Sequence, residues 1–304
     1  MVAINNSVYK PLISIIVNCF NGEKYLKESL LSILKQTYSN WEVIFWDNQS
    51  SDNSKKIFSE FKDKRFKYFI SEKHTPLYEA RNNAIQNSKG ELIAFLDTDD
   101  WWKEDKLEKQ VSFFEDNKVG IVYSNCLIFF EKSKKTKIFS KKILSSGYIT
   151  KDLFKDYKVS IMTVLLRRIA YDSASGFNSK YNIIGDFDLI IRLSNNWKFV
   201  SIQEPLAYYR IHNDNFSLKN EIIELEEFEN LIKDSKIISD ENLKPHLHYI
   251  NQRIIFLKTV KYINDGKFMK AIKNIIYFPI NFNKIKLIMY IFLPKKFIKK
   301  MQGL

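Results

Sequence analysis

Four short apolar runs alternate with stretches of helical spacing over roughly the first 120 residues, and this alternation restricts the fold more than any other feature of the chain. The runs are rich in β-branched and aromatic residues and span 13–17, 41–46, 65–70 and 91–96. Such runs are expected of strands that are buried on both faces. Strand–helix repeats predict a mostly parallel sheet with helices on both faces, so we expect an α/β fold.

The loops after three of these strands are polar or acidic, and they span 18–21, 47–50 and 97–100. Because ligands of parallel sheets bind outside the carboxyl ends of the strands, these loops should meet at one edge. The third loop holds three carboxylates, which repel one another unless a cation or hydrogen-bond donors compensate. Mg²⁺ or Mn²⁺ shared with a substrate phosphate would compensate them. A solvated acidic start of the next helix is the alternative.

The pattern changes after about residue 120. A Lys- and Ser-rich stretch over 132–146 predicts a hairpin or a mobile loop, and a helix should begin near Asp186. From Glu221 onward the spacing is helical. Strands are predicted over 121–130, 161–166, 199–202 and 206–211.

Composition excludes several classes of protein. No spacing among the eight glycines matches the dinucleotide-binding fingerprint or the P-loop. Cys19 and Cys126 lie in apolar runs and are predicted to be buried, reduced thiols, which suits a reducing cytosol. The first ten residues are polar and have no hydrophobic signal region, and no apolar run reaches the roughly 20 residues of a membrane helix. We therefore expect a cytoplasmic location.

The net charge of +13 is concentrated near the C-terminus. Residues 251–304 hold twelve basic residues and one acidic residue, Asp265. Lysines alternate there with large apolar residues over 275–293 and 295–301, which is typical of amphipathic helices at a membrane surface. An ordinary surface helix and nucleic-acid binding are the alternatives, and no nucleic-acid-binding motif supports the second. We predict a helical, basic, amphipathic extension over 219–304 that associates with an anionic membrane surface.

An ordered set of short motifs resembles the family 2 glycosyltransferases over about residues 11–217. The motifs span 15–21, 47–52, 80–82, 90–100, 106–110, 176–177, 186–189 and 209–212. The resemblance implies a GT-A fold, which is Rossmann-like with a mostly parallel sheet flanked by helices. It also implies an inverting transfer from a nucleotide sugar. We expect a catalytic domain over 1–218, with a nucleotide-binding half at about 11–118 and an acceptor half at about 119–218.

The resemblance also implies roles for residues at the nucleotide. By motif position, Asn18, Phe20 and Asp47 would hold the nucleobase and ribose. Arg81 would lie near the base or the diphosphate, although its helix also offers ordinary charge partners. Asp97 would contact the ribose.

The reaction centre is assigned in the same way. Asp99 would carry Mn²⁺ or Mg²⁺, and His212 would reach the metal or the diphosphate, with a structural histidine as the alternative. Asp186 would be the general base, with a helix cap as the alternative. Two positions depart from the family pattern: Gly185 stands where an acidic residue usually precedes the base, and Asn48 stands where a second aspartate is common.

The resemblance favours a UDP-sugar as donor and a saccharide or lipid-linked saccharide as acceptor, in the synthesis of a bacterial surface glycan. The enzyme would then work in the cytoplasm or at the inner face of the membrane. A non-catalytic module that binds nucleotide sugars is one alternative, prompted by Gly185. A sugar-phosphate nucleotidyltransferase is another, but its glycine-rich loop is absent after the first strand, where Gly22 stands alone.

Overall fold

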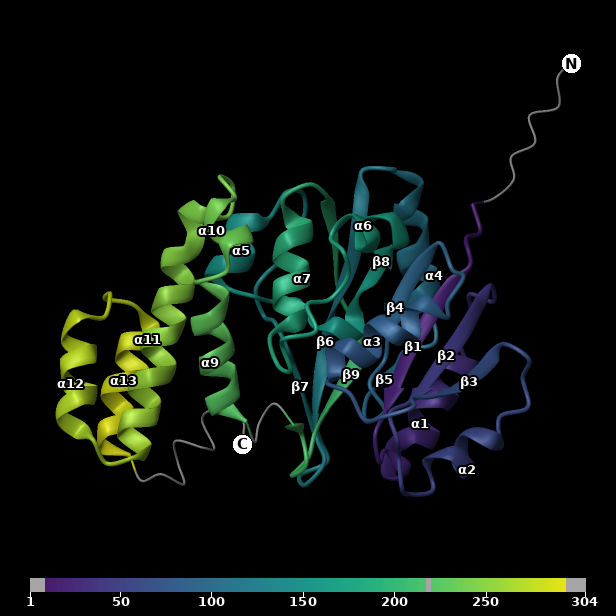
Figure 1. Ribbon diagram of the computed structural model, residues 1–304, viewed down its shortest axis with the longest axis horizontal. Helices are drawn as coiled ribbons and strands as arrows, with labels where there is room; N and C mark the ends of the chain where they lie inside the picture. The colour runs from purple at the N-terminus through teal and green to yellow at the C-terminus, as the bar shows by residue number, and fades with distance from the viewer. Residues whose placement is uncertain (1–8, 217–219, 294–304) are drawn as a thin grey trace, which may run out of the picture. The chain divides into compact units, whose positions relative to one another are not determined.

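A computed structural model describes residues 9–216 and 220–293 (Figure 1). The chain divides into two compact units, Met1–His212 and Asn213–Leu304. The predicted domain boundary after residue 218 lies slightly later in the chain than the division between these two units, and it stays a prediction. The part of the predicted amphipathic pattern over 295–301 lies outside the described residues.

The first unit is built on one nine-stranded sheet in the order β3-β2-β1-β4-β8-β6-β9-β5, with β7 paired to β6. The first four of these strands are mutually parallel, and β8 then pairs antiparallel to β4. The predicted α/β fold with a mostly parallel first half is therefore confirmed. The strands are β1 (Ile13–Cys19), β2 (Trp41–Asp47), β3 (Phe66–Ile70), β4 (Leu92–Phe95), β5 (Trp101–Trp102), β6 (Val119–Phe130), β7 (Lys135–Ile138), β8 (Leu165–Arg167) and β9 (Lys198–Ile211).

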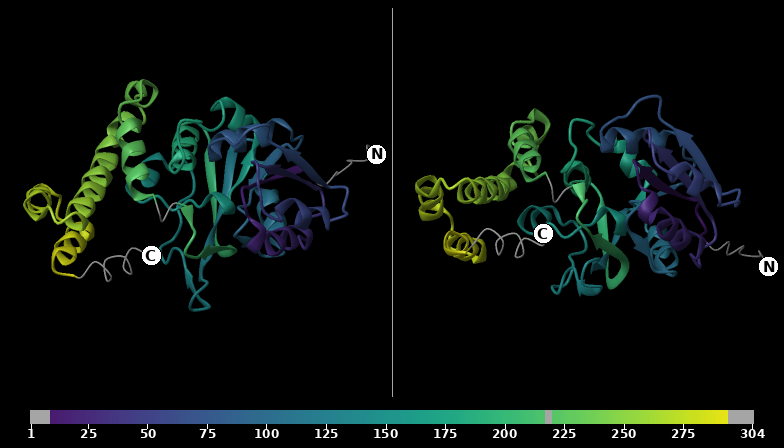
Figure 2. Two further views of the ribbon diagram at one scale, coloured as in Figure 1. Left: turned by 60° about the horizontal axis from the view of Figure 1, so that its bottom comes forward. Right: turned by 90° about the horizontal axis from the view of Figure 1, so that it is seen from below.

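Helices cover both faces of this sheet (Figure 2). Alternate residues of β1 (Ile13, Ile15 and Val17) join one core cluster with Leu26 and Leu30 of α1. The opposite face of β1 packs against α3. The helices of this unit are α1 (Glu23–Leu34), α2 (Ser54–Ser59), α3 (Leu77–Gln86), α4 (Lys106–Val111), α5 (Thr150–Lys155), α6 (Arg168–Ser173) and α7 (Gly185–Ser194), with 3₁₀ turns η1 (Ser112–Glu115) and η2 (Ile161–Thr163).

Two strand predictions were wrong in part. The predicted strand over 161–166 is instead η2 followed by the short β8. The 3₁₀ turn forms because the amide and the hydroxyl of Thr163 both donate hydrogen bonds to the carbonyl of Ser160. The two predicted strands over 199–202 and 206–211 are one continuous β9. Register shifts around Asn125 of β6 let β9 continue through Pro205, since a bulge accommodates a residue without an amide hydrogen. Of the stretch 132–146, predicted as a hairpin or a mobile loop, 135–138 forms β7 and pairs with the end of β6, while 139–146 contains no helix or strand.

The second unit is helical, as predicted, and holds its own small core. Val260 and Ile263 of the longest helix pack with Ala271, Leu287 and Tyr290 of the two helices that follow it. None of the helices in the described part of the chain combines the length and the hydrophobicity that a bilayer span requires. The elements are α9 (Glu221–Leu231), α10 (Ser235–Ser239), η3 (Lys244–His246), α11 (Leu247–Asn264), α12 (Phe268–Tyr277) and α13 (Phe282–Phe292).

The motif over 106–110 forms a buried polar cluster in the first unit. Lys106 is fully buried, and its ammonium donates to Gln110 Oε1 at 2.7 Å and lies 4.2 Å from the centre of the Trp102 ring. The Gln110 amide donates in turn to the carbonyl of Thr163 at 2.7 Å. The motif therefore joins α4 to the sheet and contributes to the fold. Burial lowers the pKa of Lys106 to about 7.

This pKa predicts that the first unit gains stability as the pH rises above neutrality. Between about pH 7 and pH 10 the unfolded chain keeps the proton that the folded Lys106 has released. The free energy of unfolding should therefore rise by up to about 1.4 kcal/mol per pH unit. Lys106→Met should flatten this slope in denaturant titrations at pH 7, 8 and 9. Lys118→Met, which changes an exposed lysine, should keep it, and equal slopes in the two variants would contradict the prediction.

Candidate active site

The loops that follow β1 and β2 are joined by hydrogen bonds at the carboxyl edge of the sheet. The Asn21 amide donates to Ser50 Oγ at 3.0 Å, and the Ser51 amide donates back to Asn21 Oδ1 at 2.8 Å. Further along, the Glu23 amide donates to Asp52 Oδ2 at 2.9 Å. The other oxygen of Asp52, Oδ1, accepts a hydrogen bond of 2.9 Å from the Ser54 amide at the start of α2, so Asp52 joins the first loop to this helix. These hydrogen bonds hold the first two loops of the predicted binding edge together.

An exposed aromatic pair lies at this edge. The Phe20 ring is 54% exposed, and its centre lies 4.3 Å from that of His74. His74 is held by Nδ1, which lies 3.0 Å from the carbonyl of Asn48. Sequence reasoning gave His74 no role, and no local pattern marks it, because its contact with Phe20 joins separate loops. The two rings offer a flat surface suited to stacking with a planar ligand.

Two of the predicted nucleotide-binding residues, Asp47 and Asn18, have buried side-chain polar atoms. Asp47 accepts hydrogen bonds from the Ser50 amide at 2.7 Å and the Tyr68 hydroxyl at 2.6 Å, so both of its carboxylate oxygens support the fold. The amide nitrogen and oxygen of Asn18 are buried without a hydrogen-bond partner. An amide left in this state is costly, so polar groups of a ligand that reached Asn18 would be stabilised there.

Asp99 and His212 meet at the acidic loop. His212 Nε2 lies 2.9 Å from Asp99 Oδ2, although the two residues are 113 positions apart. The strand β9 brings His212 to this place, because its register against β5 sets Tyr208 opposite Trp101. A carboxylate oxygen is a suitable ligand for Mn²⁺ or Mg²⁺, whereas an imidazole nitrogen suits transition-metal cations better than it suits Mg²⁺. Within the described residues no group of three or more His, Cys, Asp or Glu is arranged as a metal cage.

The other two carboxylates of the loop have different partners. Asp97 Oδ1 accepts a hydrogen bond of 2.6 Å from the guanidinium of Arg81, whose side chain is buried. Asp100 is buried and accepts a hydrogen bond of 2.8 Å from the amide of Arg210. Burial and the neighbouring carboxylates raise the pKa of Asp100 well above its ordinary value. Asp100 therefore braces the loop against β9.

Arg210 also fixes the loop. Its Nε donates to the carbonyl of Asp99 at 2.8 Å, its Nη2 pairs with Glu28, and its guanidinium lies 4.5 Å from the centre of the Tyr25 ring. Sequence reasoning placed Arg210 in a motif without giving it a function. The signal that could have found it is its position two residues before His212, which lies just beyond the end of β9.

Asp186 lies in the first turn of α7, where Ile184 is the N-cap residue, so the carboxylate does not fill the capping position. Asp186 Oδ1 accepts hydrogen bonds from the Phe187 amide at 2.8 Å and from the Tyr78 hydroxyl at 3.3 Å. Burial raises the pKa of Asp186 above its ordinary value, while the Phe187 amide, the charge of Arg81 and the Tyr78 hydroxyl oppose this. A carboxylate with a raised pKa is a stronger proton acceptor.

The unusual glycine before Asp186 has a structural explanation. A Cβ atom added at Gly185 would lie 2.4 Å from Cδ2 of the Tyr78 ring, which is closer than real contacts allow. Tyr78 is itself buried, and its hydroxyl also donates to the carbonyl of Ile183 at 3.0 Å. Tyr78 therefore fills the space that a side chain at 185 would need, and it supplies a polar contact to Asp186 from another helix. Sequence reasoning missed Tyr78.

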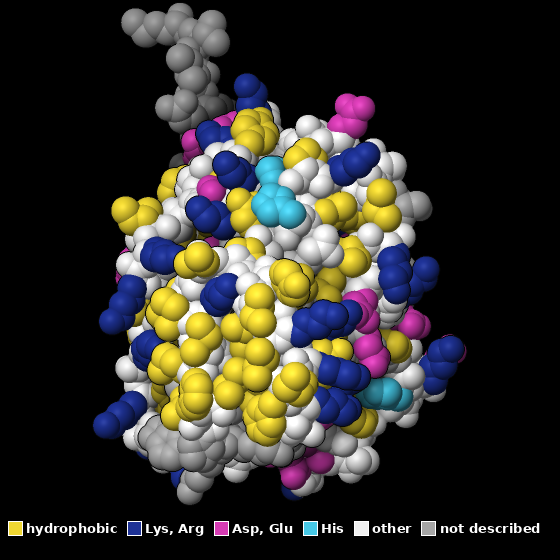
Figure 3. All heavy atoms as spheres, turned by 90° about the vertical axis from the view of Figure 1, so that its left-hand side faces the viewer, with side chains coloured by type: hydrophobic (Ala, Val, Ile, Leu, Met, Phe, Trp, Pro, Cys, Tyr) yellow, Lys and Arg dark blue, Asp and Glu magenta, His cyan; other side chains and the backbone are white. Residues whose placement is uncertain are grey.

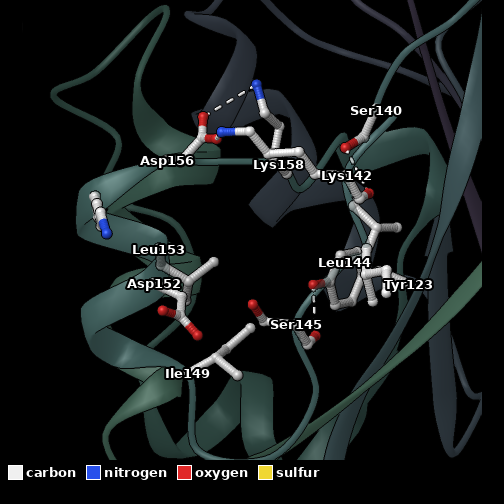
Figure 4. Close-up of a pocket in the computed structure, with 12 residues that line it drawn as sticks. Tyr123, Ser140, Lys142, Leu144, Ser145, Ile149, Asp152, Leu153, Asp156 and Lys158 are labelled. Carbon is white, nitrogen blue, oxygen red and sulfur yellow. Dashed lines mark hydrogen bonds and ion pairs between the residues drawn. The ribbon is translucent and has the colours of Figure 1, made fainter. Parts of the chain in front are cut away.

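A hollow of about 180 Å³ lies elsewhere in the first unit, beside α5 (Figure 4). Two of its lysines, Lys142 and Lys158, pair with Asp156 at 3.0 and 3.1 Å. Tyr123 and Leu144 line its other side. The predicted site residues do not line this hollow, so it is separate from the edge described above.

Related sequences agree with the resemblance. The profile of glycosyl transferase family 2 matches residues 14–173. An Escherichia coli protein named UDP-Glc:alpha-D-GlcNAc-diphosphoundecaprenol beta-1,3-glucosyltransferase is 36% identical over 157 residues, which are 52% of this chain and 60% of that protein. This chain therefore spans less than two thirds of that relative. An uncharacterized glycosyltransferase of Methanocaldococcus jannaschii is 30% identical over 84% of this chain and 88% of its own length.

Solved structures share the fold. The mannosyltransferase PcManGT from Pyrobaculum calidifontis, in complex with GDP-Man and Mn²⁺, has a TM-score of 0.63 at 16% identity and covers 88% of this chain and 75% of its own. S. aureus TarS 1–349 in complex with UDP-GlcNAc has a TM-score of 0.58 at 15% identity and covers 86% and 88%. These likenesses confirm the GT-A-like fold. Because the family profile covers more than half of the sequence, the chain belongs to glycosyl transferase family 2.

Proposed function

We propose that the chain transfers a sugar from a UDP-sugar to a saccharide or lipid-linked saccharide, with inversion at the anomeric carbon and with Mn²⁺ or Mg²⁺. The observation that carries the proposal is the Asp99–His212 contact of 2.9 Å, a donor set for a divalent cation at the carboxyl edge of the sheet. The family assignment removes the sugar-phosphate nucleotidyltransferase alternative. The non-catalytic module remains as the second candidate.

The donor would lie across the edge formed by the first two loops and the acidic loop. Its base would stack on the Phe20–His74 pair, and its ribose would be hydrogen-bonded by Asp97, which Arg81 holds in place. Asp99 and His212 would hold the metal, with diphosphate oxygens completing its coordination. The bound cation would neutralise charge that develops on the leaving diphosphate. Asn18 and Asp47 would support the base and ribose from below.

The acceptor hydroxyl would lose its proton to Asp186. A sugar hydroxyl is a poor nucleophile, and a positioned carboxylate that removes its proton makes it a better one. The deprotonated oxygen then attacks the anomeric carbon from the side opposite the diphosphate, and the bond to the diphosphate breaks. Attack from the opposite side inverts the anomeric centre. Arg81 and Tyr78 would act as positioning residues, since each one influences the pKa of Asp186.

The acceptor and the location are inferred from relatives and charge. The printed name of the E. coli relative describes transfer from UDP-Glc to a diphosphoundecaprenol-linked sugar, and TarS was solved with UDP-GlcNAc. We propose a similar lipid-linked acceptor in the synthesis of a bacterial surface glycan, at the cytoplasmic face of the membrane. The lysine-rich C-terminal unit supports this location.

A direct test combines the purified chain with UDP-Glc, UDP-GlcNAc, UDP-Gal or GDP-Man, each with Mn²⁺ and a synthetic lipid-diphosphate-linked GlcNAc. Transfer from a UDP-sugar that stops in EDTA is expected, and NMR of the product should show an inverted anomeric centre. Retention of configuration would overturn the mechanism. Binding of a nucleotide sugar without transfer to any saccharide acceptor would favour the non-catalytic module.

Tyr78→Phe should raise the pKa of Asp186 and lower activity at neutral pH. The lost hydroxyl donates to the carboxylate, and a hydrogen bond to the charged form favours that form. Because the base acts when deprotonated, the acidic limb of the kcat–pH profile should move to higher pH. Tyr157→Phe is the matched control, because the Tyr157 hydroxyl is buried near Asp186 without a hydrogen-bond partner. If Tyr78→Phe lowered activity but left the acidic limb of the kcat–pH profile at the wild-type pH, Tyr78 would have only a packing role.

A further inference from the structure

The second unit exposes an apolar face that the proposed transfer chemistry does not use. Of the 23 large hydrophobic side chains exposed among the described residues, eleven lie within 268–292. Figure 3 shows hydrophobic side chains gathered on the face of the molecule that is turned toward the viewer. Soluble monomers rarely expose a contiguous apolar patch larger than a few hundred Å². The apolar face is defined by the six residues that are 63–94% exposed: Met269, Ile276, Tyr277, Ile280, Phe282 and Phe292.

This face exists because α12 and α13 are apolar on two sides. Their inner sides already supply Ala271, Ile275, Leu287 and Tyr290 to the small core with α11. The remaining hydrophobic side chains have no place in that core and point outward. A helix that is apolar on most sides is normally buried in a larger body or in a membrane. The small core therefore leaves the outer side chains of α12 and α13 available to a binding partner.

The charge around the face identifies the occupant. The segment 266–293 contains five lysines and no acidic residue. Lys267 pairs with Asp265 at 3.3 Å, and Lys284 donates to two backbone carbonyls at the end of α12. Lys270, Lys273 and Lys286 have no carboxylate partner among the described residues, and Figure 3 shows basic side chains along the border of the patch. Lysine is depleted in protein interfaces, whereas it extends its ammonium toward anionic headgroups at membrane surfaces.

We infer that this apolar face binds the surface of an anionic phospholipid bilayer, with α12 and α13 lying in the plane of the interface. The helices have 10 and 11 residues, so each is about 15–17 Å long at 1.5 Å per residue. The hydrocarbon core of a bilayer is about 30 Å thick, so such helices insert their apolar sides and do not cross it. The inference does not depend on the proposed donor chemistry, although a lipid-linked acceptor would lie in the same surface.

The test measures sedimentation of the full-length chain with vesicles of phosphatidylcholine alone or mixed with phosphatidylglycerol. A face variant carries Met269→Ser, Ile276→Ser, Ile280→Ser and Phe292→Ser, and a charge variant carries Lys270→Glu, Lys273→Glu and Lys286→Glu. The matched control removes four exposed apolar side chains of the first unit. The control changes are Ile70→Ser, Ile143→Ser, Tyr148→Ser and Ile169→Ser.

Wild type and control should bind the anionic vesicles, and the face and charge variants should lose binding by more than about tenfold. Added salt should weaken wild-type binding. Unchanged melting temperatures would show that the variants are folded, as expected for solvent-facing positions. A wild-type chain that stays in the supernatant, or a face variant that sediments like wild type, would overturn the inference. The inference would also be overturned if wild type formed a dimer, the face variant did not, and neither wild type nor the face variant bound vesicles. No sugar donor is present, so failure here leaves the proposed transfer reaction untouched.

Discussion

Asp186→Asn should lower kcat for sugar transfer by about 10²–10⁴-fold while changing the dissociation constant of the donor by no more than a few fold. An amide has the same shape as the carboxylate, and its oxygen still accepts hydrogen bonds from the Phe187 amide and the Tyr78 hydroxyl. It does not accept the proton of the acceptor hydroxyl. The local structure should therefore survive while the chemical step fails. Single-turnover transfer and titration with UDP measure the two quantities separately.

Asp172→Asn is a matched control for this experiment, since it removes an exposed carboxylate from α6. It should transfer at the wild-type rate. If Asp186→Asn also transferred at the wild-type rate, another group would be the base and the site would have to be reassigned. If donor binding fell in parallel with kcat, Asp186 would serve the nucleotide and not the acceptor.

Asp99→Ala should remove the metal-dependent part of donor binding and lower kcat/KM by about 10³-fold, or about 4 kcal/mol. Asp99 Oδ2 is one of the two candidate metal ligands, and its loss leaves the imidazole of His212 alone. In wild type, UDP at 100 times its Kd should stabilise the fold by about 2.7 kcal/mol with Mn²⁺ present. In Asp99→Ala this thermal shift should fall to the value seen in EDTA.

His212→Ala should reproduce this loss, because it removes the other half of the same pair. Asp105→Ala, which removes a carboxylate that pairs with Lys109 beyond the acidic loop, should keep the Mn²⁺-dependent shift. A full Mn²⁺-dependent shift in Asp99→Ala would show that the cation is held elsewhere. A variant that melts lower even without nucleotide would indicate a structural role, which the unliganded melting curve records in the same experiment.

The first half of the fold was predictable because its signals are local. Each of the first four strands is an apolar run that ends at polar residues, and each following helix carries its own periodicity. The continuous β9 was not predictable, since Gln203, Glu204 and Pro205 interrupt its apolar pattern. The strand continues because β9 carries extra residues opposite Asn125 of β6, and such register shifts belong to the pairing of two distant segments.

The candidate site, like the fold, was only partly predictable from the sequence. The carboxylates of the acidic loop stand out in the sequence as a cluster, but their separate partners do not. Asp97, Asp99 and Asp100 look equivalent in the chain, yet they meet Arg81, His212 and the backbone of Arg210 respectively. The contact between Tyr78 and Gly185 joins positions on two helices, so a single sequence offers no spacing that would reveal it.

The position of His212 at the end of the first unit bears on how such enzymes could be recombined. All the candidate donor and metal residues lie in one uninterrupted stretch, and His212 is its last residue before Asn213 opens the second unit. A chimera joined at this point would exchange the whole second unit and leave the candidate donor and metal residues in place. A chain simply cut there would end on His212, and its new terminal carboxylate would compete for the cation. We therefore expect the same junction to tolerate grafting better than truncation.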